Sequence, residues 1–246
     1  HKVATGSYAR LLKMELDKYG YRSFIDCDDL QDLSRLFGYV SHGTETMVIF
    51  GSRDVFTRKW CLGEIVTARI HEVQTVLLSF PGFAAPDEDF IASLTKTFPE
   101  VLDLVSHRMG MKEIEDTLVW IPSLETINVD RQVSPASVAE VVSHLAGDHH
   151  RRLVSKRVAV PECLILADLD TMEAAAAAYV LHGFLVPLAL KKNSAVMPEV
   201  HLGPELPLDL KAIFLVCSEQ CFENPTYASW LWQLRGLEEC AVVPVV

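Results

Sequence analysis

The side chains best suited to chemistry stand in one stretch, MVIFGSRDVFTRKWCLGEIVTA, at residues 47–68. An apolar run ends at Ser52, and a short polar loop leads from there to Trp60 and Glu64. Trp60 and Glu64 are four residues apart, so a helix would stack them on one face. The pattern predicts a buried strand, then a helix that holds an aromatic plane beside a carboxylate. Ligands of open α/β sheets bind at the carboxyl ends of the strands, which is where this pair would lie.

This stretch resembles the TIR (Toll/interleukin-1 receptor) domain family, in which a strand ending in Ser precedes W-C-x-x-E on the third helix. The matching residues are Ser52, Trp60, Cys61 and Glu64. Two upstream blocks fit the family in the same order. Residues 21–30 resemble its second strand and the following loop, and residues 1–16 resemble the end of its first motif and its first helix. The resemblance covers residues 1–80 and implies a flavodoxin-like, doubly wound parallel sheet.

Some TIR domains hydrolyse NAD at the bond between nicotinamide and ribose, so the resemblance implies NAD as a possible substrate rather than a resident cofactor. Cleavage of that bond develops an oxocarbenium ion, which a nearby carboxylate stabilises. The match assigns that catalytic role to Glu64. It assigns NAD binding to Trp60, Lys2 and Ser52. The ring of Trp60 could face the cationic nicotinamide, and Lys2 could contact a phosphate group. The alternative is a non-catalytic TIR adaptor that acts through other TIR domains or self-association.

Each of these residues also has a purely structural interpretation. Glu64 could be an exposed carboxylate near a helix N-terminus, where the helix dipole favours it. Trp60 could anchor the helix in the core, and Cys61 could be a small buried apolar residue. No metal site is predicted: Asp26, Asp28 and Asp29 could hold Mg²⁺ but favour a solvated loop, and His149-His150 lacks a third ligand at a suitable spacing. The family's glycine is missing between residues 26 and 37, which weakens the prediction of assembly through that loop.

Composition narrows the class of protein. The 246 residues are half apolar, and the net charge is −11. A nucleic-acid binder usually carries a basic patch, whereas the densest basic run here, residues 149–157, is interpreted as a solvated linker. Six cysteines without a C-x-x-C pair favour reduced thiols in a cytoplasmic protein. The apolar runs are interpreted as shorter than the ~20 residues that span a bilayer, so no membrane segment is predicted in this chain.

The order of strand-like and helix-like segments predicts two units. A TIR-like unit is expected at 1–150, with its first strand upstream of residue 1, a basic linker at 147–157, and a second α/β unit at 158–246. Residues 212–218 repeat the pattern of 47–52, and residues 241–246 repeat that of 75–80. The second unit is degenerate, because Ser229-Trp230-Leu231-Trp232 stands where a catalytic Glu would be. Activity is therefore expected in the first unit.

Two other expectations concern the second unit. A helix is predicted from Thr171 to His182, ended by Gly183 and followed by a strand at 184–190. Asp168, Asp170 and Thr171, with Ser218 after a later strand, resemble the first two motifs of haloacid-dehalogenase phosphatases, although the threonine is one residue early. A receiver domain is a weaker alternative, since Cys217 or Ser218 stands where its phosphoacceptor aspartate should be.

Overall fold

The structure is a computed structural model that describes residues 2–25, 36–146, 163–191, 197–207, 210–237 and 240–246. It forms two compact units. The first comprises residues 24–130, and the second comprises residues 2–23 together with 131–246. These units differ from the predicted ranges 1–150 and 158–246 by two helices, those at residues 2–18 and 135–146. The Asp26, Asp28 and Asp29 cluster, the glycine-free loop up to residue 35 and the basic linker lie outside the described residues.

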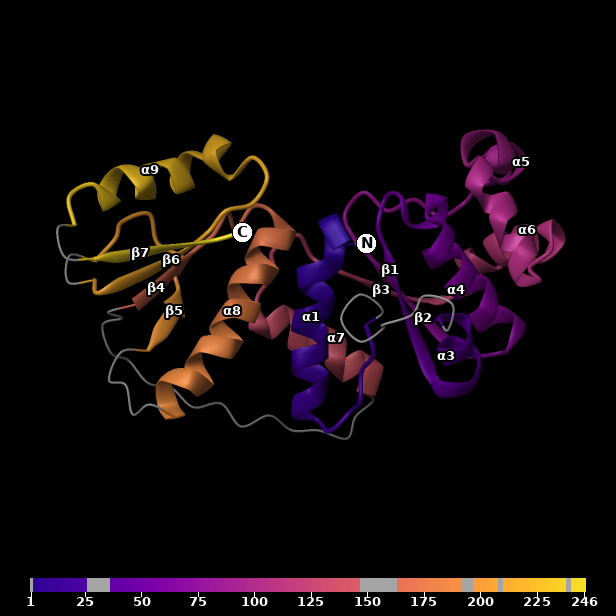
Figure 1. Cartoon of the computed structure of the whole chain (residues 1–246), viewed down its shortest axis with the longest axis horizontal. Helices are drawn as coiled ribbons and strands as arrows, with labels where there is room; N and C mark the ends of the chain where they lie inside the picture. The colour runs from indigo at the N-terminus through magenta and orange to yellow at the C-terminus, as the bar shows by residue number, and fades with distance from the viewer. Residues whose placement is uncertain (1, 26–35, 147–162, 192–196, 208–209, 238–239) are drawn as a thin grey trace. The chain divides into compact units, whose positions relative to one another are not determined.

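The first unit is a parallel sheet covered by helices (Figure 1). Its strands are β1 (Thr46–Gly51), β2 (Gln74–Ser79) and β3 (Glu125–Asn128), hydrogen-bonded in that order. The helical elements are α3 (Leu36–Gly43), η2 (Val55–Thr57), α4 (Lys59–Ile70), α5 (Glu88–Thr97), η3 (Pro99–His107), α6 (Met111–Trp120) and η4 (Ile121–Ser123). The predicted strands at 47–50 and 75–80 and the helix at 58–72 are therefore confirmed, each within two residues.

The core of the first unit lies where α4 meets the sheet and α6. Ile49 of β1 and Leu77 of β2 are buried together with Leu62 and Ile65 of α4 and Leu118 of α6. Burying a side chain of this size contributes about 1.5–3 kcal/mol relative to leaving it exposed. The core thus fixes α4, the helix that carries Trp60 and Glu64, against the strands.

The second unit is a four-stranded parallel sheet with helices on both faces. Its strands are β4 (Cys163–Leu166), β5 (Pro198–Val200), β6 (Ala212–Val216) and β7 (Ala241–Val245), in the order β5-β4-β6-β7. Leu164 of β4 and Leu215 of β6 pack with α9 (Pro225–Leu234), whereas Ile165 and Val216 pack with α8 (Met172–Lys191). This order is the 2-1-3-4 part of the flavodoxin-like arrangement, so the predicted α/β class with doubly wound parallel strands is confirmed.

Helix α1 (Lys2–Lys18) belongs to the second unit, where it packs beside α8 and also contacts α7 (Pro135–Ala146) (Figure 1). Gly20 ends α1 with φ +81°, and the N–H groups of Gly20 and Tyr21 donate to the carbonyls of Asp17 and Leu16. These two bonds form a Schellman motif. The strand predicted at 21–26 is not found in its described part, because residues 21–25 pair with no strand.

Gly183 does not end a helix. Helix α8 continues through Gly183 and Pro187 to Lys191, so the predicted helix end at Gly183 and the predicted strand at 184–190 are both wrong. A Cβ atom at Gly183 would overlap the side chain of Met14 on α1. The glycine therefore serves the close approach of α1 to α8 rather than a turn.

The uninterrupted α8 is longer than the apolar runs on which the prediction of no membrane segment was based. Among the described helices, α8 is long and apolar enough to cross a bilayer by length and composition alone. One such helix is weak support for a membrane segment, because the core helices of soluble proteins pass the same test. Only the first part of α8 contains buried residues: Ala174 and Ala178 are buried, whereas Phe184 and Leu188 are exposed.

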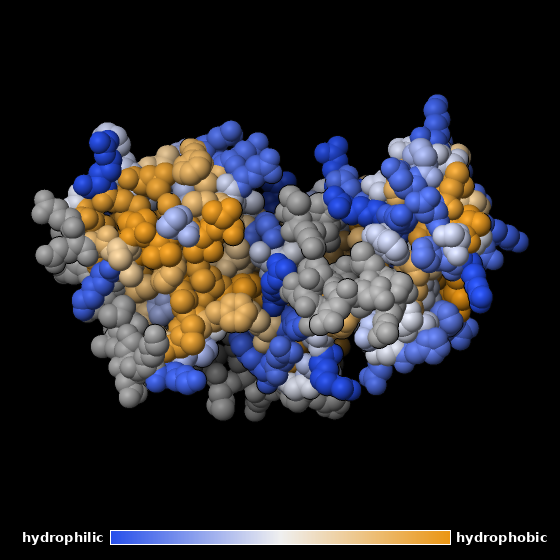
Figure 2. Space-filling view, viewed as in Figure 1, coloured by the Kyte–Doolittle hydropathy of each residue, from blue (hydrophilic) through white to orange (hydrophobic). Residues whose placement is uncertain are grey.

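Strand β7 is an edge strand of the described sheet, and its surface is apolar. Val242 and Val243 are exposed, and apolar residues gather over the strands of this unit (Figure 2). The N–H of Ala241 donates to the carbonyl of Lys211, and the carbonyl of Val245 accepts from the N–H of Cys217. The main-chain N–H and C=O groups of residues 241, 243 and 245 therefore point toward β6. The main-chain groups of residues 242 and 244 point toward the open edge, and Pro244 lacks an N–H that could donate a hydrogen bond there.

Candidate functional site

Ser52 lies at the carboxyl end of β1 with its hydroxyl buried. The residue is 6% exposed, and its Oγ atom has no hydrogen-bond partner among the described residues. Its carbonyl accepts from the N–H of Val55, which begins η2 and leads the chain into α4. A buried polar atom without a partner costs stability and calls for an explanation, of which a role at a ligand site is one. The predicted position of Ser52, at the end of a strand that precedes the Trp60–Glu64 helix, agrees with this geometry.

Glu64 lies in the second turn of α4 and is half-buried. The first turn holds no acidic residue, and the N-cap residue, Arg58, makes no side-chain capping bond. The helix dipole acts mainly within the first turn. The position of Glu64 beyond the first turn and its partial burial therefore disfavour the interpretation of Glu64 as an exposed carboxylate stabilised by the helix dipole.

Trp60, one turn before Glu64, is packed among other side chains. Its ring lies 5.8 Å from that of Phe37 and 5.7 Å from that of His107, centroid to centroid. The ammonium of Lys59 lies 5.2 Å from the ring centroid, while it also pairs with Asp103 at 2.9 Å. This aromatic cluster, Phe37, Trp60 and His107, favours the interpretation of Trp60 as an anchor for α4.

Phe37 and His107 are the residues that sequence reasoning missed at this site. They come from α3 and η3, 23 residues before and 47 residues after Trp60 in the printed sequence. Neither residue has a spacing to Trp60 that would indicate contact. The glycine between Trp60 and Glu64 was the available signal, because a glycine inside a helix often marks a close approach.

Gly63 is that point of close approach, and replacing it with alanine is expected to destabilise the first unit by about 1–3 kcal/mol. The added methyl would lie 2.6 Å from the ring of Phe37 and 3.0 Å from Leu104. Gly38→Ala in α3 is the matched control, since no atom of the described residues lies within 4 Å of its added methyl. The control should be neutral or stabilise the helix by up to about 1 kcal/mol. Urea unfolding measures both, and equal effects would contradict the close-packing argument.

Lys2, the fourth predicted site residue, begins α1 and so belongs to the second compact unit. Ser52, Trp60 and Glu64 all belong to the first. The structure therefore brings three of the four predicted residues into one β1–η2–α4 segment and leaves Lys2 outside it.

The loop after β6 repeats the loop after β1. Ser218 accepts from the N–H of Cys221 at 3.3 Å, as Ser52 accepts from Val55 at 3.3 Å. The Ser218 Oγ atom is likewise buried, with no hydrogen-bond partner in the part of the chain that the structure describes. A short 3₁₀ turn, η5 (Cys221–Glu223), then leads into α9, as η2 leads into α4.

Asp168, at the carboxyl end of β4, is a hydrogen-bonded hub. It is 7% exposed. One oxygen accepts from the Thr171 hydroxyl at 2.8 Å, and the other accepts from Asn224 Nδ2 at 2.7 Å and from the N–H of Asp170 at 3.2 Å. Asn224 also donates to the exposed Asp170 and caps α9 by accepting from Thr226 and Tyr227. These bonds favour a structural role over that of a phosphatase nucleophile.

Tyr227, the cysteines and any possible metal ligands are the remaining groups that could take part in chemistry. Burial raises the pKa of the Tyr227 hydroxyl, which donates to the carbonyl of Val216 at 2.8 Å. The five described cysteines are free thiols, and Cys27 lies outside the described residues. Within the described ranges, no group of three or more His, Cys, Asp or Glu side chains is arranged to hold a metal ion.

Comparisons with known proteins add one structural likeness. No family model matches the sequence, and no curated protein matches it. A similar solved chain comes from the TIR domains of the activated Roq1 resistosome, which directly recognises the pathogen effector XopQ. The likeness covers 59% of this chain and 95% of that one, with a TM-score of 0.46 and 14% identity. Nothing about activity or assembly follows from a likeness at this level.

Proposed function

We propose that this chain is a TIR-type cytoplasmic signalling protein whose first unit binds NAD and hydrolyses it to nicotinamide and ADP-ribose. The observation that carries the proposal is the β1–η2–α4 segment. It holds a buried, unpartnered Ser52 hydroxyl at the end of a parallel strand and a half-buried Glu64 on the helix that follows. The W-C-x-x-E pattern around Glu64 and its two companion blocks support the family.

Glu64 is proposed to act on the ribose. As the bond to nicotinamide breaks, positive charge develops on the sugar, and a carboxylate in a partly buried place stabilises that charge more than water does. Water then adds to the sugar carbon and loses a proton, and nicotinamide leaves with the electron pair of the broken bond. Ser52 is proposed to donate a hydrogen bond from its hydroxyl group to the bound nucleotide. The second unit is proposed to be a degenerate repeat, supported by its matching Ser218 turn and by the absence of an equivalent of Glu64.

The decisive experiment is nicotinamide release from NAD by the purified chain, compared with Glu64→Gln. The substitution keeps the shape of the side chain and removes its charge, so we expect the rate to fall by about 100-fold or more. Glu45→Gln, an exposed carboxylate just before β1, is the control and should keep the full rate. Equal rates in the Glu64 variant and the parent would remove Glu64 from the mechanism.

A non-catalytic adaptor is the second candidate, and the packing of Trp60 favours it. With Phe37, His107 and Lys59 around the indole, Trp60 supports α4 instead of presenting a face to nicotinamide. This candidate predicts no nicotinamide release even at high protein concentration. It also predicts self-association that is equal in the parent and Glu64→Gln by analytical ultracentrifugation.

A further inference from the structure

The first unit has a groove between α5 and α6 that plays no part in the proposed NAD chemistry. The hollow has a volume of about 300 Å³. On one side it is lined by Glu88, Ile91, Ala92 and Thr95, and on the other by Met111, Glu115 and Val119. These spacings place each set on a single face of its helix. The groove is therefore built from two helix faces, not from loops.

Part of the groove's lining is apolar and open to solvent. Val119 is 66% exposed, and Ile91 and Met111 are only partly buried. A large β-branched side chain left this exposed beside other apolar groups marks a surface that can bury more area on binding. This apolar lining thus suits apolar side chains from a partner.

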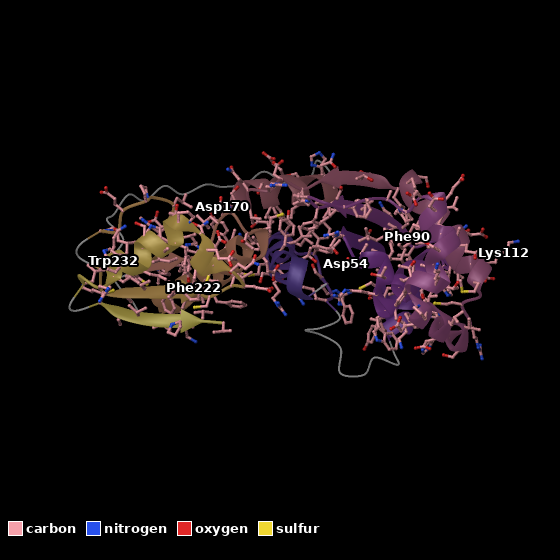
Figure 3. All side chains as sticks on the ribbon, turned by 90° about the horizontal axis from the view of Figure 1, so that it is seen from above. Asp54, Phe90, Lys112, Asp170, Phe222 and Trp232 are labelled. Atoms are coloured by element: carbon pink, nitrogen blue, oxygen red, sulfur yellow. The ribbon has the colours of Figure 1, made fainter. Side chains whose placement is uncertain are left out.

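Each helix contributes one carboxylate to the lining of the groove, Glu88 from α5 and Glu115 from α6. The surroundings are also acidic, because residues 87–97 and 111–120 together have six carboxylates and two lysines. Lys112, one of the two, projects outward from α6 (Figure 3). Such a rim attracts a basic partner and repels nucleic acid and anionic lipid. A second copy is also a poor occupant, because the whole chain carries a net charge of −11.

We propose that the α5–α6 groove docks a basic amphipathic helix of a partner protein. Both walls are helices, whose main-chain groups bond within the helix, so the groove offers no strand edge to an extended peptide. A helical partner satisfies its own main chain and needs only side-chain pockets. Helix α5 has 10 residues, which is about 15 Å, enough for anchors at i, i+3 or i+4, and i+7 of the partner.

The test uses a fluorescently labelled helical peptide of about 18 residues, with leucines at i, i+3, i+4 and i+7 and lysines on its other face. Binding to the full chain is measured by fluorescence anisotropy. Val119→Asp should weaken binding by about tenfold or more, because it places a charge on the apolar lining of the groove. Glu88→Lys with Glu115→Lys should weaken it by a similar factor and reduce its dependence on salt. Circular dichroism checks that each variant is folded.

Two controls make the result decisive. Leu102→Asp changes an exposed apolar residue of η3 that does not line the groove, and it should leave the affinity unchanged. A peptide of the same composition with its leucines scattered around the helix should bind at least about tenfold more weakly. Equal binding of the two peptides, or an unchanged affinity in Val119→Asp, would overturn the proposal by reducing the interaction to general charge attraction. NAD turnover is a separate readout, so neither result bears on the role of Glu64.

Discussion

Trp230→Ala is expected to destabilise the second unit by about 3–5 kcal/mol, the range for removing a buried aromatic side chain. Trp230 is 2% exposed, and its indole N–H donates to the carbonyl of Gly203 at 3.0 Å. Its ring also packs against Tyr227 and His201, at centroid distances of 6.3 Å and 5.5 Å. The substitution leaves a cavity and an unpaired carbonyl on the segment that leads from β5 to β6.

Trp232→Ala is the matched control for this prediction. Trp232 lies two residues further along α9, is 71% exposed, and has the guanidinium of Arg235 at 4.7 Å from its ring centroid. Losing one exposed cation–π contact costs about 0.5–1 kcal/mol. Urea unfolding followed by circular dichroism separates the two variants. A loss for Trp232→Ala as large as that for Trp230→Ala would contradict the assignment of Trp230 to the core.

Asp168→Ala is expected to lower the free energy of unfolding by about 2–4 kcal/mol. The change removes the acceptor for Thr171, Asp170 and Asn224 and leaves the Asn224 amide with one partner fewer beside the start of α9. Bonds to a charged acceptor are the stronger kind, although their contributions are not additive.

Asp170→Ala is the control for Asp168→Ala. Asp170 is exposed and accepts from Asn224 at 2.8 Å, so its removal should cost about 1 kcal/mol or less. Thermal unfolding of the two variants gives the comparison. If Asp168→Ala were as stable as the parent, the hydrogen bonds of the Asp168 carboxylate would not be what holds β4 and α9 together. A chemical role for Asp168 would then become the better interpretation.

The strands and helices with strong local patterns could be predicted from the sequence. The apolar run before Ser52 and the helical spacing after Trp60 gave β1 and α4 within two residues. Strands β3 and β5 were missed because they are short: β3 is the polar ETIN, and β5 is the three-residue PEV. Pairing with a neighbouring strand, not an internal pattern, makes them strands.

Gly183 shows why a local signal can fail. Glycine after an alanine-rich helix indicates a C-terminus, yet α8 continues through Gly183 to Lys191. Met14, on a helix distant in sequence, occupies the space that a side chain at Gly183 would fill, so the glycine is explained by a tertiary contact and not by a helix end. The same limit applies at the candidate site. The spacing of Trp60 and Glu64 predicted one helix correctly, but the packing of Phe37 and His107 on the indole depends on tertiary contacts that no spacing encodes.

Pro244 affects the tendency of the protein to aggregate at high concentration. An exposed, apolar edge strand is a template on which another chain can add a strand, and repeated addition leads to aggregates and fibrils. The sequence AVVPV would otherwise suit such growth, since it is rich in valine and uncharged. Because Pro244 stands at one of the positions that face the open edge, an incoming strand would find a missing donor and a ring in its way. Pro244 thus opposes the addition of another strand at the open edge of β7, although the pairing of β7 with β6 does not itself require a proline at this position.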